Sequence, residues 1–277
     1  MSDLQILIAA FGPEALKRIA NLPHPEMQGV EYLVSWQNHE SQPVPSSLSE
    51  REDFKIFRES TIGLCHNRNA LLKKATASHV LISDDDLSYS VGNIKSVING
   101  FRRYPDCDFL TFRYESENDG KTYPAETFTM NKPPKGYFTT SMELALNLAS
   151  IRDKGISILF NTAFGVNGTH FGSGEEDILI ASMLRHGLKG RYIPDFICFN
   201  TESTTSERNG TTQGFIQTKG AVMLYVKPHS WVMRMLTHAI RASRTPNPRH
   251  IPFLTYCKWW LQGVKMARNY KVFENQI

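Results

Sequence analysis

The strongest constraint on the fold is a repeated succession of strand patterns and helix patterns along the first 112 residues. An apolar run over residues 4–10 ends at a Gly-Pro turn, and Leu16 and Ile19 then recur at helical spacing. Strands that alternate with helices of this length indicate right-handed crossover units. The chain is therefore predicted to form an α/β fold, with a largely parallel sheet covered by helices on both faces.

The expected elements follow from the spacing of apolar residues and from the turn residues between them. Strands are predicted over 4–10, 30–36, 79–82 and 108–112. Helices are predicted over 69–77, 92–104, 175–186, 231–243 and 254–270. The polar, proline-containing stretch 114–138 is predicted to be an irregular excursion over one edge of the site, and 141–150 fits a helix or a strand equally well.

The composition is that of an ordinary globular protein rather than of a disordered or fibrous one. Hydrophobic residues make up 41% and charged residues 21% of the 277 residues, and no apolar run reaches the roughly 20 residues of a membrane-spanning helix. The four cysteines lie far apart and form no CxxC pair, which favours a reducing compartment over a disulfide framework or a zinc site. The acidic start, without an apolar leader, predicts a cytoplasmic protein.

The charge is distributed unevenly along the chain. Residues 227–277 hold nine Lys and Arg against a single acid, Glu274, while residues 1–226 hold 22 basic against 26 acidic residues. This asymmetry predicts a near-neutral body, 1–226, followed by a basic amphipathic helical extension, 227–277, that suits an anionic surface of lipid or nucleic acid. A merely solvated basic tail is the alternative.

Three consecutive carboxylates, Asp84, Asp85 and Asp86, follow the predicted strand over 79–82. Adjacent carboxylates raise one another's pKa unless a cation or hydrogen-bond donors are near. In an extended segment Asp84 and Asp86 point to one side and Asp85 to the other. Such a pair suits Mg²⁺ or Mn²⁺, with substrate phosphates completing the coordination. The alternative is that Asp85 and Asp86 only cap the next helix.

A second acidic group, Glu175, Glu176 and Asp177, opens the predicted helix over 175–186. Acids are common in the first turn of a helix because they interact favourably with its dipole. A carboxylate at the rim of a pocket also serves as a general base for an attacking hydroxyl. The residues alone leave both interpretations open.

The order of these motifs resembles that of glycosyltransferase family 2, which has the GT-A fold and a DxD motif. The first signature is matched by Gly63, by Arg68-Asn69, by Ala75 and by the strand that ends in the acidic triplet. The later Glu-Asp motif is matched by the stretch 171–177, with Gly187 and a returning strand after it. The resemblance covers roughly residues 4–226. It implies a Rossmann-like mixed sheet, with a nucleotide-sugar half over about 1–112 and an acceptor half over about 113–226.

This resemblance implies a role for each acidic group. Asp84 and Asp86 would hold the diphosphate of a nucleotide sugar through Mn²⁺ or Mg²⁺, with Asp86 the more direct ligand. Asp177 would be the catalytic base, with Glu176 as the second candidate. The other nucleotide-sugar contacts would come from the following residues, of which Lys219 is a lone phosphate contact: Ala9, Ala10, Phe11, Gln37, Arg68, Asp85 and Lys219.

Two departures from the family pattern concern the nucleobase and the metal. Many members carry an acid after the second strand, whereas this chain has Gln37 and Asn38 there, so one of these amides would have to contact the base. A histidine that many relatives carry beyond the last core strand is missing over 196–202. The resemblance therefore implies neither the identity of the base nor a third protein ligand to the metal.

The segment 228–277 interleaves aromatic and basic residues, and three interpretations of it are open. Its composition suits an interfacial helix pair on anionic lipid, which would place a peripheral protein on the cytoplasmic face of a membrane. The same residues would stack on and neutralise single-stranded nucleic acid. In the third interpretation the aromatic side chains simply pack on the body as core.

The motifs and the resemblance together predict an inverting, metal-dependent glycosyltransferase. It would move a sugar, preferably from a UDP-sugar, to a saccharide or lipid-linked saccharide during synthesis of a surface polysaccharide or another glycoconjugate. One alternative is a sugar-phosphate nucleotidyltransferase, but the glycine-rich basic loop expected after its first strand is absent over 9–13. The other is a non-catalytic, membrane-docking adaptor of the same fold.

Overall fold

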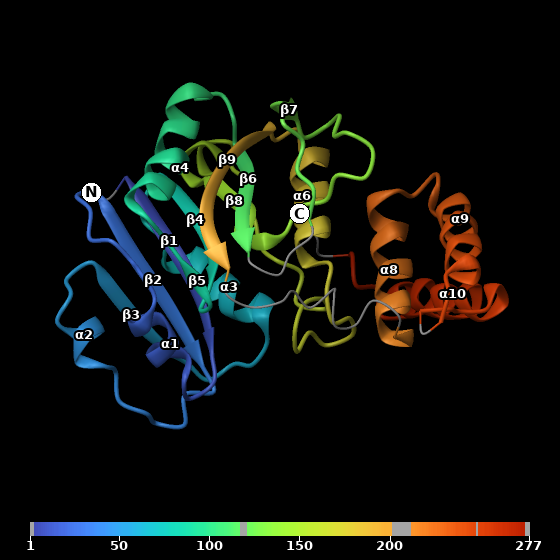
Figure 1. Cartoon of the computed structure of the whole chain (residues 1–277), viewed down its shortest axis with the longest axis horizontal. Coiled ribbons are helices and arrows are strands. Elements are labelled where there is room, and N and C mark those ends of the chain that lie inside the picture. The colour runs from blue at the N-terminus through green and yellow to red at the C-terminus, as the bar shows by residue number, and fades with distance from the viewer. Residues whose placement is uncertain (1–2, 117–120, 201–211, 248, 275–277) are drawn as a thin grey trace.

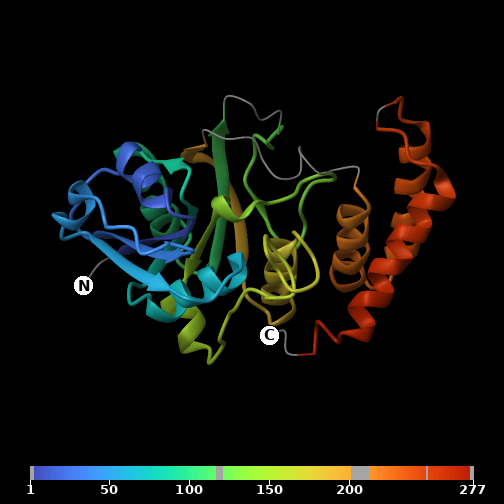
Figure 2. The same cartoon turned by 90° about the horizontal axis from the view of Figure 1, so that it is seen from below.

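The structure, a computed structural model, describes residues 3–116, 121–200, 212–247 and 249–274. A twisted sheet lies at the centre with helices on both faces, and three further helices lie at one end (Figures 1 and 2). The strands are β1 (Leu4–Phe11), β2 (Val30–Gln37), β3 (Phe54–Glu59), β4 (His79–Asp84), β5 (Leu87–Ser88), β6 (Phe109–Ser116), β7 (Phe128–Thr129), β8 (Leu144–Asn147) and β9 (Gly190–Asn200). The helices are α1 (Ala15–Asn21), α2 (Ser46–Ser49), α3 (Leu64–Lys74), α4 (Val91–Arg103), η1 (Ser141–Glu143), α5 (Leu148–Asp153), α6 (Glu175–Arg185), α8 (Gln213–Val226), α9 (Trp231–Arg244) and α10 (Phe253–Asn269).

The order of the strands places most carboxyl ends at one edge of the sheet. β3, β2, β1 and β4 are neighbours in that order and run parallel. β8 is antiparallel to both β4 and β6, and β9 runs parallel to β6, so β6 and β9 point the same way as β4. The short strands β5 and β7 pair antiparallel with β9. The predicted mixed, largely parallel sheet is confirmed, and ligands in such sheets bind at the carboxyl edge.

The sheet buries apolar side chains on both faces because successive residues of a strand point to opposite sides. In β1, Leu4, Ile6 and Ile8 belong to the core on the side of α1 and α4. Leu7 and Ala9 belong to the core on the side of α3, α5 and α6. Figure 2 shows these two helical layers on opposite sides of the sheet. The nearly continuous apolar sequence of β1, interrupted only by Gln5, is thereby explained by a two-sided core.

The helices α8, α9 and α10 form a small core of their own around Tyr256 and Trp260. Two glycines let α8 and α10 cross closely. A Cβ on Gly263 would lie 1.9 Å from the carbonyl oxygen of Gln217, and one on Gly220 would lie 2.3 Å from that of Trp260. Tyr256 and Trp260 are therefore part of this core, whereas Tyr270, further along the same segment, is 57% exposed.

Several elements differ from the sequence prediction. The first long helix begins at Leu64 rather than at residue 69, and the undecided stretch 141–150 contains η1, β8 and the start of α5. Neither β3 nor α8 was predicted, because β3 is only partly buried at the sheet edge and α8 is apolar without a clear polar face. Among the described residues no helix is long and apolar enough to cross a membrane.

Candidate active site

Arg68 joins the two acidic groups that the sequence singles out. It lies on α3 and is 1% exposed. Its Nη2 donates to Asp84 Oδ1 at 2.8 Å and its Nη1 donates to Glu175 Oε1 at 3.0 Å. Because a charge this deeply buried is stable only when it is paired and hydrogen-bonded, the two carboxylates and Arg68 hold one another in place. The end of β4 and the start of α6 thus meet at the carboxyl edge of the sheet.

The three aspartates of the triplet do not share one direction. Asp85 Oδ2 accepts hydrogen bonds from the backbone N–H of Phe11 at 3.0 Å and from Arg18 at 2.7 Å. Burial raises the pKa of Asp85 to about 6, although Arg18 and the Phe11 N–H act in the opposite direction. Asp84 instead faces Arg68, on the other side of the strand. Asp84 ends β4, whereas Asp85 and Asp86 form the turn between β4 and β5, so the triplet is not the extended segment for which an alternation of sides was predicted.

The strand ends of β1 and β2 form a cradle beside α3. The backbone N–H of Gly63 donates to Gln37 Oε1 at 3.2 Å, and Asn67 Nδ2 donates to the carbonyl oxygen of Ala10 at 3.0 Å. Within the described residues, Gln37 Nε2 and Asn67 Oδ1 are buried and lack a hydrogen-bond partner. Since a buried polar atom without a partner is costly, the cradle offers one donor and one acceptor to a ligand. Phe11, 42% exposed, ends β1 at this cradle.

The start of α6 requires glycine. Gly174 precedes the helix with a φ of +90°, a left-handed conformation that side chains disfavour. A Cβ on Gly174 would also lie 2.5 Å from Val222 Cγ2 on α8. Glycine at this position therefore lets α8 approach the acidic first turn of α6.

The remaining two acids of α6 have perturbed proton affinities. Burial and the neighbouring Glu175 carboxylate raise the pKa of Asp177 to about 6, against the opposing effect of the Lys219 ammonium. Burial and its two acidic neighbours also raise the pKa of Glu176 well above its usual value, although Arg68 acts in the opposite direction. A carboxylate with a pKa near the working pH is suited to general-base catalysis. Strongly perturbed acids in a site are also candidates for function.

Lys219 connects the acids of α6 with the C-terminal helices. It is half-buried on α8 and within electrostatic range of both Asp177 and Arg241. Burial and the Arg241 charge lower the pKa of Lys219, while Asp177 raises it. The sequence suggested Lys219 as a phosphate contact. In the structure Asp177 is the carboxylate whose charge raises the pKa of Lys219.

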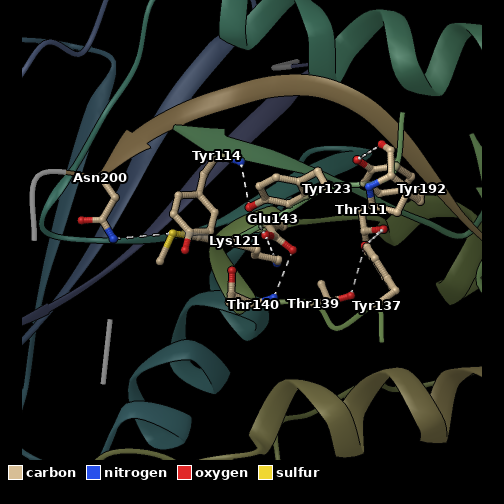
Figure 3. A network of polar contacts seen from close by, with 12 residues as sticks. Thr111, Tyr114, Lys121, Tyr123, Tyr137, Thr139, Thr140, Glu143, Tyr192 and Asn200 are labelled. Atoms are coloured by element: carbon tan, nitrogen blue, oxygen red, sulfur yellow. Dashed lines mark hydrogen bonds and ion pairs between the residues drawn. The ribbon is translucent and has the colours of Figure 1, made fainter. Parts of the chain in front are cut away.

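A polar network holds the excursion that follows β6 (Figure 3). Glu143, fully buried at the end of η1, pairs with the Lys121 ammonium. It also accepts hydrogen bonds from the Tyr123 hydroxyl at 2.5 Å and from the Thr140 backbone N–H at 3.1 Å. Figure 3 shows these side chains converging on Glu143 beneath the curved β9. This cluster was not predicted from the sequence, although Thr140-x-x-Glu143 is a capping-box pattern.

A cavity of about 390 Å³ opens beside this network. It is lined by side chains from the ends of β6 and β9 and from the excursion, among them Arg113, Lys121, Tyr123 and Phe196. The Arg113 guanidinium lies 4.1 Å from the centre of the Phe196 ring. The strand β5, which directly follows the acidic triplet, pairs with the end of β9: Ser88 lies opposite Phe199, and Phe199 lines the cavity. The cavity is therefore close to the acidic triplet.

The acidic residues could supply only a small number of ligands to a metal ion. In the part of the chain that the structure describes, no group of three or more His, Cys, Asp or Glu side chains could hold a metal ion. Asp84 Oδ1 accepts from Arg68, while its side chain keeps 26% of its surface exposed. A cation at this edge would thus have at most two side chains of these types as ligands. This fits a hard cation whose other ligands are water and phosphate.

Comparison with known proteins gives one family and a set of similar folds. The model of the protein family described as "Glycosyl transferase family 2" matches residues 39–165. None of the curated proteins matches the chain in sequence. Crystal structures of S. aureus TarS 1–349 in complex with UDP and with UDP-GlcNAc both have a TM-score of 0.55 and 14% identity. They are matched over 99% and 98% of this chain and over 74% and 73% of theirs. At this identity the likeness shows the fold, and the predicted GT-A fold is confirmed.

Proposed function

Since residues 39–165 match glycosyl transferase family 2, we propose that this chain transfers a sugar from a nucleoside-diphosphate sugar to a hydroxyl of an acceptor. The chain is a glycosyltransferase. The proposed donor is a nucleoside-diphosphate sugar. The proposed acceptor is a saccharide or lipid-linked saccharide, in the synthesis of a surface polysaccharide or glycoconjugate. The UDP and UDP-GlcNAc complexes of TarS, which shares the fold, support a UDP-sugar as the first donor to test.

The observation that carries the proposal is the double pairing of Arg68. Through this one buried side chain the donor-side Asp84 and the first turn of α6 are held at the same edge of the sheet. A transferase needs a site for the leaving diphosphate and a base for the acceptor within reach of one anomeric carbon. We assign Arg68 a positioning role for both sides, in place of a direct contact with the nucleotide.

Asp84 and Asp86 would hold a divalent cation together with the diphosphate. When bound, such a cation stabilises the negative charge that develops on the departing nucleoside diphosphate. Hydrogen bonds within the protein hold the residues around the cation in place: Asp85 accepts from Phe11 and Arg18, and Asp84 accepts from Arg68. Mn²⁺ and Mg²⁺ are the cations that two carboxylates and phosphate oxygens suit.

Asp177 is the proposed general base. Its carboxylate takes the proton of the acceptor hydroxyl as the oxygen bonds to the anomeric carbon, and the bond from that carbon to the diphosphate oxygen breaks. A single displacement of this kind inverts the anomeric configuration. A pKa of about 6 leaves Asp177 ionised and still basic at neutral pH.

The test uses Asp177→Asn, with Glu176→Gln as the matched control. A melting screen with UDP, GDP, CDP and dTDP sugars first identifies the nucleotide that stabilises the protein. With that donor, Asp177→Asn should lower the transfer rate by about 10²–10⁴-fold while nucleotide binding is retained. Glu176→Gln should have a smaller effect. If Asp177→Asn is fully active and Glu176→Gln is not, the base is Glu176.

The cradle around Gln37 is the proposed nucleobase site. Its support is the buried donor of Gln37 and the buried acceptor of Asn67, which complement a base edge that presents an acceptor beside a donor. Gln37→Leu should therefore weaken binding of the nucleoside diphosphate by about 10-fold or more. Inorganic pyrophosphate lacks a base, and its binding should be unchanged.

A further inference from the structure

The outward side of α10 carries a stripe of aliphatic and basic residues. The exposed residues between 254 and 268 are spaced four, three, four and three apart, so they lie along one side of the helix. They are Leu254, Lys258, Leu261, Lys265 and Arg268. Leu254 is 79% exposed and Leu261 is 45% exposed. The stripe spans 14 residue steps, roughly 21 Å.

The neighbouring helix α9 exposes a second aliphatic strip. Val232, Met233, Leu236 and Ile240 are all more than one third exposed, and Met233 reaches 67%. Arg244 lies on the same side of the helix and is also exposed. Exposed aliphatic side chains that are contiguous rather than scattered mark a surface for interaction. Together with the α10 stripe, this strip is called the outer face below.

Almost no negative charge lies near the outer face. Residues 213–274 contain one acid, Glu274, and it pairs with Lys271 three residues away. Arg241, Arg244, Lys258, Lys265 and Arg268 make no ion pair within the part of the chain that the structure describes. The outer face is therefore cationic as well as aliphatic.

We propose that the outer face binds the surface of an anionic lipid bilayer. The leucines and the aliphatic strip of α9 would enter the boundary between headgroups and acyl chains, and the lysines and arginines would lie among the lipid phosphates. A helix that lies at a membrane interface needs both aliphatic side chains that reach the acyl chains and positive charges at the level of the headgroups. Figures 1 and 2 show α9 and α10 at the end of the molecule away from β3, where the sheet does not obstruct a flat surface.

Two other occupants suit the outer face less well. Single-stranded nucleic acid is bound by exposed aromatic rings that stack on bases, whereas Tyr256 and Trp260 are buried in the core of the three helices. A second copy of the chain would bring two cationic faces together, which is repulsive. Charge complementarity thus favours an anionic lipid surface.

The test is sedimentation of the full chain with vesicles of phosphatidylcholine alone and of phosphatidylcholine with 30% phosphatidylglycerol, roughly the anionic content at which surface charge matters. The protein should sediment with the anionic vesicles, and the bound fraction should fall as salt is raised because the charges are screened. Equal sedimentation with neutral vesicles, or none with anionic vesicles, would overturn the proposal.

Two double variants separate the charge from the apolar contribution. Lys258→Glu with Lys265→Glu should weaken partitioning about 30-fold or more, since each basic residue near an anionic surface contributes about fivefold. Leu254→Ser with Leu261→Ser should weaken it about 10-fold through lost apolar burial. All four side chains are exposed, so the fold is expected to persist, as circular dichroism would verify.

The matched control reverses the same amount of charge on the body. Lys95 and Arg102 are exposed on α4, and Lys95→Glu with Arg102→Glu should sediment like the unmodified protein. If this control weakens binding as much as the α10 variant, net charge rather than the outer face is responsible and the proposal fails. Loss of binding to a single-stranded oligonucleotide in the α10 variant, without any vesicle binding, would assign the face to nucleic acid instead.

Discussion

The sheet body and the three C-terminal helices differ in whether their charged side chains form ion pairs. In the body, buried charges are matched: Arg68 with Asp84 and Glu175, and Lys121 with Glu143. Among the described residues from 213 onward, the one ion pair is Lys271 with Glu274, just beyond the end of α10. Charge that is paired inside the body holds elements at fixed positions, whereas charge left unpaired on the helices is available to something outside the chain.

The two regions also differ in how they pack. The sheet buries aliphatic side chains on both faces, and its helices cover those faces. The C-terminal helices instead approach one another through Gly220 and Gly263, where no side chain intervenes. The contrast predicts that each region is sensitive to a different kind of substitution.

The largest expected effect is the loss of the buried Arg68 charge. Arg68→Met should lower the free energy of unfolding by about 3–5 kcal/mol, because two carboxylates that face it lose their partner in a buried place. Arg241→Met, on an exposed part of α9, should change it by less than about 0.5 kcal/mol. Urea unfolding of both variants measures the difference. Equal destabilisation would contradict the contrast between paired and unpaired charge.

The second-largest expected effect is the loss of stability when the crossing of α8 and α10 is disturbed. Gly263→Ala should destabilise the protein by about 1–3 kcal/mol, since its Cβ would meet the backbone of Gln217 and α10 would have to shift away from α8. Gly214→Ala is the control, because no atom lies within 4 Å of a Cβ there. Thermal unfolding of the two variants should separate them clearly. A neutral Gly263→Ala would mean that the two helices do not cross as closely as described.

The smallest effect lies at the contact between the two regions, where Lys219 faces Asp177. A base must be ionised, so the transfer rate should fall as the pH drops through about 6, the pKa of Asp177. The Lys219 charge lowers that pKa, so Lys219→Met should move the acidic limb of the rate profile to higher pH, by about one unit or less. If the acidic limb moves to lower pH or does not move, the Lys219 charge does not lower the pKa of the base.

The sequence was sufficient for most of the sheet because periodicity reports burial. The apolar run over 4–10 and the buried strand over 79–82 are recognisable from residue type alone. The edge strand β3 was missed because only one of its residues, Phe54, is fully buried. Helix α8 was missed because it is apolar on most sides, being enclosed between α6 and α10, and shows little amphipathic period.

The candidate site was predictable as motifs but not as contacts. The acidic triplet and the acids of α6 were found from their composition. Their connection through Arg68 depends on contacts across 107 residues of chain, which no local pattern reveals. The Lys121 and Glu143 pair was missed for the same reason, because 22 residues separate its members and an irregular excursion brings them together.

Calorimetric titration of a nucleoside diphosphate, UDP first, with and without Mn²⁺, tests the central claim most directly. The account predicts that Mn²⁺ strengthens binding by at least about 10-fold in the unmodified protein, and that Asp86→Ala removes this gain while metal-free binding is kept. If the gain is the same in Asp86→Ala, or if no nucleoside diphosphate binds with Mn²⁺ present, the acidic edge of the sheet is not the donor site.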